Sequence, residues 1–288
     1  MNDTTGRGGG PVDPPPLAHI FNSTHADFDA VTPLVWGPTG EAMAARAGIL
    51  PGQRVLDVCS GTGASALAAA RLVGPAGSVT AVDFAGDLLA RAHAKASAAE
   101  LHNVEFRVAD VTDLRADDIG HFDVLTCGYG VFFLPEMDAA VRNLIDLLLP
   151  GGRLSLAVWH DDALYDFAGA YFARVARVTG EPTPPGPRDP VDDPHPITRI
   201  DTVEKITAWL ESVGAVDTRA TVLRLRIPRT DTFGWSMVLG SGLRGALDGL
   251  SPEAIAEVRR GFLQDLADAD MTEVNCDTLI ATGRRPER

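Results

Sequence analysis

The sequence predicts an α/β protein built on a doubly wound parallel sheet, and three observations lead to this fold class. Short apolar runs alternate with longer helix-forming segments through the first half of the chain. Glycines cluster in the turn after the first apolar run. An aspartate stands at or near the end of each of the first three apolar runs. Strands that alternate with helices form parallel sheets with helices on both faces, because each crossover brings the next strand back in the same direction.

The predicted elements follow one another regularly up to residue 159. Segments rich in apolar and β-branched residues are predicted strands, at residues 54–58, 78–82, 104–108, 122–127 and 153–158. Helices are predicted between them, at residues 64–73, 87–99 and 137–148. The last of these helices stops at the turn Pro150-Gly151-Gly152.

After residue 159 the pattern changes. Helices are predicted at residues 163–178, 202–213, 232–247 and 252–267. Residues 181–196 are rich in proline and aspartate and are predicted to form a surface loop. Strand-like segments follow at residues 216–225 and 276–282.

The segment before the first strand divides into two parts. Residues 1–16 are rich in glycine and proline and are predicted to be a disordered tail. Residues 17–47 carry spaced aromatic side chains and end in a strong helix former, so this part is predicted to be helical.

Composition narrows the class of protein. The net charge of −14 argues against nucleic acid and anionic membrane surfaces as partners, since both need clustered Lys and Arg. An odd number of cysteines, three, with no C-x-x-C pair fits reduced thiols rather than a disulfide framework or a zinc site. The chain has no long apolar run and no signal-peptide pattern at its start, so a cytoplasmic enzyme without a membrane span is expected.

The motif with the most chemical content is the run VLDVCSGTG at residues 55–63, a strand that enters a glycine-rich turn and a helix. Gly61 and Gly63 allow the backbone to approach a ligand closely, and the helix start offers free N–H groups. The same turn serves pyrophosphate in dehydrogenases. Asp57, just ahead of the glycines, would repel a pyrophosphate but suits a zwitterion with an ammonium group.

Two more acids stand at the ends of the next two strands. Asp83 lies about 20 residues beyond the glycines, where a carboxylate can accept hydrogen bonds from both hydroxyls of a ribose. Asp110 ends the following strand and is placed to accept from an adenine amino group. Ligands of open α/β sheets bind at the carboxyl ends of the strands, so these acids and the glycine turn predict one adenosine-containing ligand.

With these runs the sequence resembles the class I S-adenosylmethionine-dependent methyltransferases, in particular the branch of the ubiquinone and menaquinone C-methyltransferases and natural-product methyltransferases that act on small molecules. The matching runs are VLDVCSGTG, VTAVDFAGDLL, VEFRVADVTDL, FDVLTCGYGVFFL and LLPGGRLSLAVW. The resemblance implies a Rossmann-like sheet of seven strands, mostly parallel, with the last strand antiparallel. It also implies that residues 17–47 form a helical lid on a methyltransferase domain at 48–288. Insertions at about 160–201 and 230–268 would cover the substrate.

The resemblance also implies roles for particular residues, with S-adenosylmethionine as the cofactor. The residues that would bind the cofactor are Asp57, Cys59, Gly61, Gly63, Asp83, Phe84, Leu88, Asp110, Val111 and Cys127. Cys59-Ser60 departs from the family, where Gly or Ala and then Cys are more frequent.

The acceptor side of the site is less defined by the sequence. His160, at the carboxyl end of the fifth strand, is the first candidate for a general base, and His25 on the lid is the second. The candidates for substrate contacts are Tyr129, Phe132, Trp159 and Phe28. No metal is expected, because the spacing of His160-Asp161-Asp162 and of Asp192-Asp193-Pro194-His195 matches no firm metal signature.

The predicted function is methyl transfer to an oxygen, carbon or nitrogen atom of a small acceptor, with a hydrophobic or aromatic secondary metabolite favoured. Three alternatives stay open. The same fold could bind S-adenosylmethionine and catalyse another reaction such as a cyclisation, could use a nicotinamide as an NAD(P)-dependent oxidoreductase, or could be a non-catalytic subunit. The sequence also leaves a homodimer open.

Overall fold

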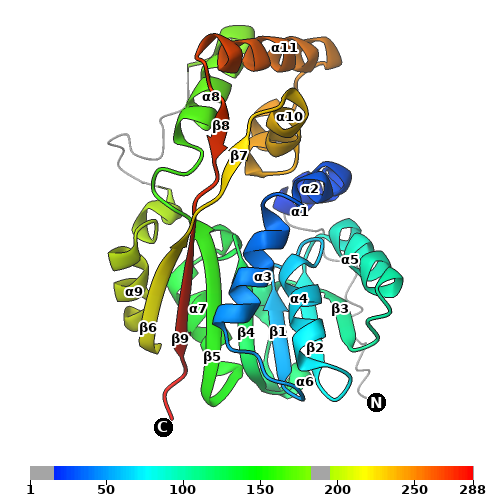
Figure 1. The fold of residues 1–288 in the computed structure, drawn as a ribbon, viewed down its shortest axis with the longest axis vertical. Helices are drawn as coiled ribbons and strands as arrows, with labels where there is room; N and C mark the ends of the chain where they lie inside the picture. Colours follow the sequence, from blue (N-terminus) through cyan, green and yellow to red (C-terminus); the bar gives the residue numbers. More distant parts are fainter. Residues whose placement is uncertain (1–15, 183–194, 288) are drawn as a thin grey trace, which may run out of the picture.

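The computed structural model describes residues 16–182 and 195–287, and its centre is a seven-stranded sheet (Figure 1). Its strands, in the order in which they lie side by side, are β3 (Val104–Val108), β2 (Ser78–Asp83), β1 (Arg54–Val58), β4 (Phe122–Gly128), β5 (Leu148–Trp159), β9 (Thr278–Arg284) and β6 (Val216–Leu223). The pairs among β1 to β5 are parallel, and β9 runs antiparallel to both of its neighbours. The predicted fold class and the antiparallel last strand are confirmed.

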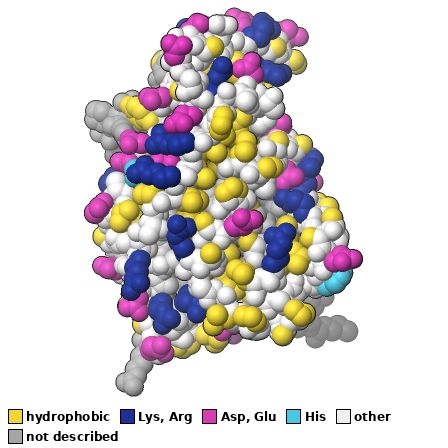
Figure 2. Space-filling view, in the orientation of Figure 1, with side chains coloured by type: hydrophobic (Ala, Val, Ile, Leu, Met, Phe, Trp, Pro, Cys, Tyr) yellow, Lys and Arg dark blue, Asp and Glu magenta, His cyan; other side chains and the backbone are white. Residues whose placement is uncertain are grey.

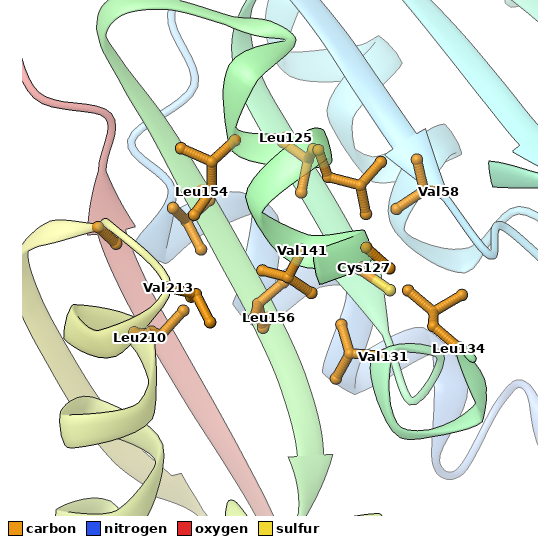
Figure 3. Close-up of a cluster of buried hydrophobic side chains, with 14 of the residues drawn as sticks. Val58, Leu125, Cys127, Val131, Leu134, Val141, Leu154, Leu156, Leu210 and Val213 are labelled. Carbon is orange, nitrogen blue, oxygen red and sulfur yellow. The ribbon is translucent and has the colours of Figure 1, made fainter. Parts of the chain in front are cut away.

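Helices cover both faces of this sheet. One face carries α3 (Trp36–Arg46), α4 (Ala64–Val73) and α5 (Gly86–Ala98), and the other carries α6 (Ala116–Ile119), α7 (Met137–Asp146) and α9 (Val203–Ser212) (Figure 1). Consecutive strand residues point to opposite faces. Val55 therefore packs with the alanines of α3 and α4, while Leu56 joins the larger core under α7 and α9. Figure 3 shows that core, with Val141 of α7 between the strand residues Leu125 and Leu156.

A second layer, which we call the cap, lies beyond the carboxyl ends of the parallel strands (Figure 1). It consists of α8 (Tyr165–Thr179), α10 (Asp231–Leu239), η4 (Gly242–Leu247), α11 (Pro252–Asp268) and the ribbon of β7 (Arg226–Pro228) and β8 (Glu273–Asn275). Its own core includes Phe167, Tyr171, Trp235 and Phe262. In Figure 2, hydrophobic side chains form a band that runs from the cap down toward α3.

Several element boundaries differ from the sequence prediction. The single helix predicted at residues 232–247 is split, because Gly240 ends α10 and the Ser241 hydroxyl accepts from the Leu243 N–H to start η4. Strand β5 begins earlier than predicted, since Leu148 already pairs with Phe122 before the register shifts. The ribbon β7–β8 was not predicted, because three residues are too few to show an alternating pattern.

The N-terminal helices are α1 (Pro16–Ser23), α2 (His25–Val31) and α3. Residues 1–15 of the predicted tail and residues 183–194 of the predicted loop lie outside the described residues. Helix α3 packs against α4 and the sheet. Of the lid predicted at residues 17–47, only α1 and α2 therefore remain outside this packing. In the part of the chain that the structure describes, no helix is long and apolar enough to cross a membrane.

Candidate active site

A cavity of about 240 Å³ lies at the carboxyl ends of β1, β2 and β4, under α1 and α2 and beside η4 of the cap. It lies where open parallel sheets bind their ligands. Most of the residues predicted for cofactor and substrate line it: Phe28, Cys59, Gly61, Asp83, Phe84, Leu88, Asp110, Val111, Tyr129, Phe132 and Trp159. The fold therefore brings together, at one place, residues that the sequence spreads over 132 positions, from 28 to 159.

The turn between β1 and α4 approaches the cavity with its backbone. Cys59, Gly61 and Gly63 all have positive φ angles, of 53°, 53° and 82°. A Cβ on Gly61 would lie 3.2 Å from the ring of Phe28. Because glycine has no Cβ, the space between the turn and α2 stays open. The structure thus leaves room for a ligand along the backbone of this turn.

Asp83 joins this turn to the end of β2. Its Oδ2 accepts from the Gly61 N–H and its Oδ1 accepts from the Ala85 N–H, both at 2.8 Å. The residue is only 6 % exposed. Burial raises the pKa of this carboxyl to about 6. The two backbone N–H groups favour the charged form and so lower the pKa, but burial has the larger effect. Each oxygen keeps a second acceptor site for a ligand hydroxyl.

Asp57 lies one residue before the end of β1, beside Ala81 of β2, and has a different role. Its Oδ1 accepts from the hydroxyls of Ser65 and Thr126, each at 2.6 Å, and the residue is fully buried. Burial raises its pKa, with the hydroxyl partners acting in the opposite direction. Asp57 therefore ties β1 to α4 and β4 behind the cavity, and it does not line the cavity as the resemblance implied. Gly63 and Cys127 also lie behind the lining.

Asp110 lines the cavity from the end of β3. Its Oδ1 accepts from the N–H of Thr112 at 2.8 Å and from the Thr112 hydroxyl at 2.7 Å, which starts the short helix η1 (Val111–Asp113). A carboxylate accepts several hydrogen bonds, so Asp110 keeps acceptor capacity beyond this cap.

Three aromatic rings form one wall of the cavity. The ring of Tyr129 lies 4.4 Å from that of Trp159 and 5.0 Å from that of Trp36. The hydroxyl of Tyr129 lies 2.9 Å from the Thr39 hydroxyl and 2.6 Å from the Thr278 hydroxyl, so both of its hydrogen-bonding directions are used. Burial raises the pKa of this phenol far above its ordinary value. Tyr129 therefore shapes the wall and stays neutral.

Replacing Tyr129 with phenylalanine is expected to destabilise the fold by about 1–2 kcal/mol, because the buried hydroxyls of Thr39 and Thr278 lose a partner. The ring keeps its place between the two tryptophans, so binding in the cavity should change little. Urea unfolding and a ligand titration on the same variant check both parts. A loss of binding without a loss of stability would show instead that the hydroxyl contacts the ligand.

The two histidines expected to act as bases lie outside the cavity lining. His160 Nδ1 is 2.8 Å from Asp161 Oδ1, and its backbone N–H donates to Asp277, where the sheet joins the cap. His25 Nδ1 accepts from Arg91 Nε at 2.5 Å. His160, Asp161 and Asp162 each bring one potential ligand atom within 4.8 Å of the others, but this group is also separate from the cavity.

Some lining residues were not predicted as site residues. Trp36, Thr39 and Met43 come from α3, and Ser241 and Gly242 come from the start of η4. The spaced aromatics of residues 17–36 were a usable signal for Trp36. The η4 residues gave none, since a serine and a glycine before a short helix are found in many loops.

A seven-stranded sheet of this order, with its cavity at the glycine turn and the β2 acid, is the fold of the class I S-adenosylmethionine-dependent methyltransferases. The chain belongs to the ubiE/COQ5 methyltransferase family, which it matches over residues 17–179.

Individual relatives agree with this family. The chain is 32 % identical over 142 residues to a demethylmenaquinone methyltransferase of Lactococcus lactis. This match covers 48 % of this chain and 56 % of that protein. It is 33 % identical over 143 residues to the ubiquinone/menaquinone biosynthesis C-methyltransferase UbiE of Pseudomonas putida, with the same coverage. The chain thus spans about half the length of the curated relatives it matches.

Among solved structures, the YcgJ protein of Bacillus subtilis has a TM-score of 0.53 to this chain at 19 % identity, and the match covers 86 % of this chain and 97 % of that one. A likeness at this identity supports the fold.

Proposed function

We propose that this chain transfers the methyl group of S-adenosylmethionine to a ring carbon of a small apolar aromatic acceptor of the quinol type. The observation that carries the proposal is the continuity of the cavity, in which the glycine turn and Asp83 share one space with the aromatic wall of Trp36, Tyr129 and Trp159. The names of the relatives support a quinol acceptor and a carbon target. The family match gives no support to the cyclase, oxidoreductase or non-catalytic alternatives.

The cofactor half of the cavity fits this assignment. Asp83 would accept from the ribose hydroxyls, because its oxygens are buried, carry only backbone partners and keep free acceptor sites. Asp110 would accept from the adenine amino group, with Val111, Phe84 and Leu88 against the base. The backbone at Cys59 and Gly61 would border the methionine part. Bound there, the cofactor supplies an electrophilic methyl group on its sulfonium sulfur.

The acceptor half favours a neutral, planar ring. Among the residues that the structure describes, no Lys, Arg, His or Glu lines the cavity, so an acceptor carrying a carboxylate or phosphate would lack a partner inside it. Phe28, Phe132 and Phe133 and the aromatic wall offer flat apolar contact instead.

The same lining bears on the chemistry. Tyr129 is held neutral, and neither His25 nor His160 reaches the cavity. We therefore place no general base at the acceptor. A quinol would supply the needed electron density by ionising its own hydroxyl. The carbon beside that hydroxyl would take the methyl group as the C–S bond of the sulfonium breaks and leaves S-adenosylhomocysteine. The ring proton would then be lost and the oxygen would regain one, so that one proton is released in all. The protein contributes alignment of the two reactants and exclusion of water.

The test is incubation of the protein with S-adenosylmethionine labelled in its methyl group and reduced 1,4-naphthoquinone as a probe acceptor. We expect label in the naphthoquinol with a new carbon–methyl bond, identified by mass spectrometry and NMR. His160→Ala and His25→Ala should retain most of this rate. Label on the oxygen, or no label on any quinol or phenol tried, would contradict the proposed acceptor chemistry.

The pH dependence of cofactor binding gives a separate prediction. The pKa of Asp83 is about 6, so the carboxylate that would accept the ribose hydroxyls is lost as the pH falls through that value. Affinity for S-adenosylhomocysteine should drop about tenfold per pH unit below 6 and stay level above 7. Fluorescence titration from pH 5 to pH 8 measures this.

Unfolding would not explain such a loss. A carboxyl whose pKa is raised on folding, above its ordinary value of 3.8, makes the ligand-free fold more stable as the pH falls through this window. The Asp83→Asn variant should bind weakly at every pH, and a wild-type affinity that stays constant down to pH 5 would contradict the assignment.

A further inference from the structure

Helices α1 and α2, which we call the lid, lie over the cavity and the glycine turn. Phe21 and Phe28 of the lid line the cavity, and the Phe28 ring stacks on Trp36 with ring centres 5.2 Å apart. On its other side the lid meets the cap, where a Cβ on Gly240 would come within 2.6 Å of the Asp27 carbonyl. The lid is thus packed against the cavity wall, where Trp36 Nε1 also donates to the Phe28 carbonyl at 3.0 Å, and against the cap.

The third side of the lid is polar and faces α5. Three contacts join them: Asn22 Oδ1 accepts from the Asp87 N–H at 3.0 Å, Arg91 Nε donates to His25 Nδ1 at 2.5 Å, and Lys95 Nζ lies 2.6 Å from Asp29 Oδ1. Residues four apart in a helix lie on one face, so the three partners on α5 form a single row.

The first of these contacts completes α5 itself. Ala85 precedes the helix and has no side-chain acceptor for the unpaired N–H groups of the first turn. Asn22 of the lid supplies that acceptor at Asp87.

The last contact reaches the cofactor turn. The Thr32 hydroxyl lies 3.3 Å from Asp29 Oδ1 and 3.4 Å from the hydroxyl of Thr62, a residue of the turn that also lines the cavity. Burial alone would raise the pKa of Asp29, but Lys95 and the two threonine hydroxyls hold it below its ordinary value. Asp29 is therefore charged at neutral pH and connects α5, the lid and the turn.

We propose that the Asp29–Lys95 ion pair is a latch that holds the lid closed over the cofactor turn, which makes Lys95 a positioning residue for methyl transfer. Lys95 does not line the cavity and touches neither reactant. Its side chain is 32 % exposed and that of Asp29 25 %, so solvent screens the pair and the latch can open. What the closed cavity holds rests on the proposed function, whereas the closure itself does not.

The latch is tested on Lys95→Met, which removes the charge and keeps the length of the side chain. Without any ligand, the backbone amides of α2 should exchange with deuterium about two- to fivefold faster than in the wild type, while those of β4 and β5 stay unchanged. Release of S-adenosylhomocysteine, followed by tryptophan fluorescence after rapid dilution, should accelerate by the same factor. Lys95→Arg should restore both rates.

The chain offers a matched control in α9. Lys205 Nζ also lies 2.6 Å from an aspartate oxygen, Asp201 Oδ1, and α9 packs at the opposite end of the sheet from the lid (Figure 1). Lys205→Met removes an ion pair of the same length and should leave both the exchange of α2 and the release rate at the wild-type values.

A double-mutant cycle separates a latch from a general loss of stability. If the two side chains act through each other, adding Asp29→Asn to Lys95→Met should change the α2 exchange little further. Wild-type exchange of α2 in Lys95→Met, or fully additive effects, would overturn the latch. Failure of the wild type to bind S-adenosylhomocysteine would instead count against the proposed function, since the exchange measurement uses no ligand.

Discussion

Replacing Asp83 with alanine is expected to weaken the binding of S-adenosylhomocysteine by about a hundredfold or more. Two ribose hydroxyls would lose a charged acceptor, and hydrogen bonds to charged groups are worth about 1.5–3 kcal/mol each. The Gly61 N–H, which donates to Asp83 Oδ2, would also lose its partner, so the turn proposed to border the methionine part would shift. Calorimetric titration of the variant and the wild type measures the difference.

A second acidic residue serves as the control for this experiment. Asp138 accepts from Trp209 Nε1 at 2.8 Å and pairs with Arg199, on α7 and away from the cavity. Asp138→Ala removes a comparable set of hydrogen bonds and should leave the affinity unchanged. If Asp83→Ala bound as tightly as the wild type while remaining folded, the ribose assignment would be wrong.

The second large effect is expected at Gly40, where α3 crosses the start of α4. A Cβ at this position would lie 2.6 Å from the Ala64 carbonyl carbon and 2.7 Å from the Ser65 nitrogen, and backbone atoms cannot rotate away as a side chain can. Gly40→Ala should therefore destabilise the fold by about 3 kcal/mol, because α3 must move off α4. The unfolding temperature should fall by roughly 5–10 °C.

The same substitution at Gly169 provides the contrast. No atom lies within 4 Å of a Cβ built there, and the residue is inside helix α8. Gly169→Ala should stabilise the protein by about 0.5–1 kcal/mol, because alanine is the better helix former. Equal unfolding temperatures for the two variants would contradict the close backbone contact between α3 and α4 at Gly40.

The sheet could be predicted from the sequence because each strand carries its own signal. A parallel strand buried on both faces reads as a short and mostly apolar run, as in residues 54–58, where Val55, Leu56 and Val58 are buried, and helix-forming segments separate most of these runs. The residues predicted for the cofactor share this property, since Asp83 ends β2 while Gly61 and Asp110 follow shortly after β1 and β3, and the topology brings these strand ends to one edge.

The acceptor side could not be predicted in the same way, because contacts between distant residues decide it. Tyr129 is positioned by Thr39, 90 residues earlier, and by Thr278, 149 residues later, and no local pattern reports either contact. Asp57 and Asp83 both lie near the carboxyl ends of their strands, yet the hydroxyls of Ser65 and Thr126 engage Asp57 behind the cavity. His160 has a place in the sequence that suits a base, but at the junction with the cap it pairs with Asp161.

The central claim is that the cavity binds the adenosyl cofactor of a methyltransferase, and calorimetric titration of the wild type with S-adenosylhomocysteine tests it most directly. The account predicts one site per chain with an affinity in the micromolar range, and no heat of binding from NAD⁺ under the same conditions. Binding of NAD⁺ in place of S-adenosylhomocysteine, or of neither, would contradict it and would require a different ligand for the glycine turn and Asp83.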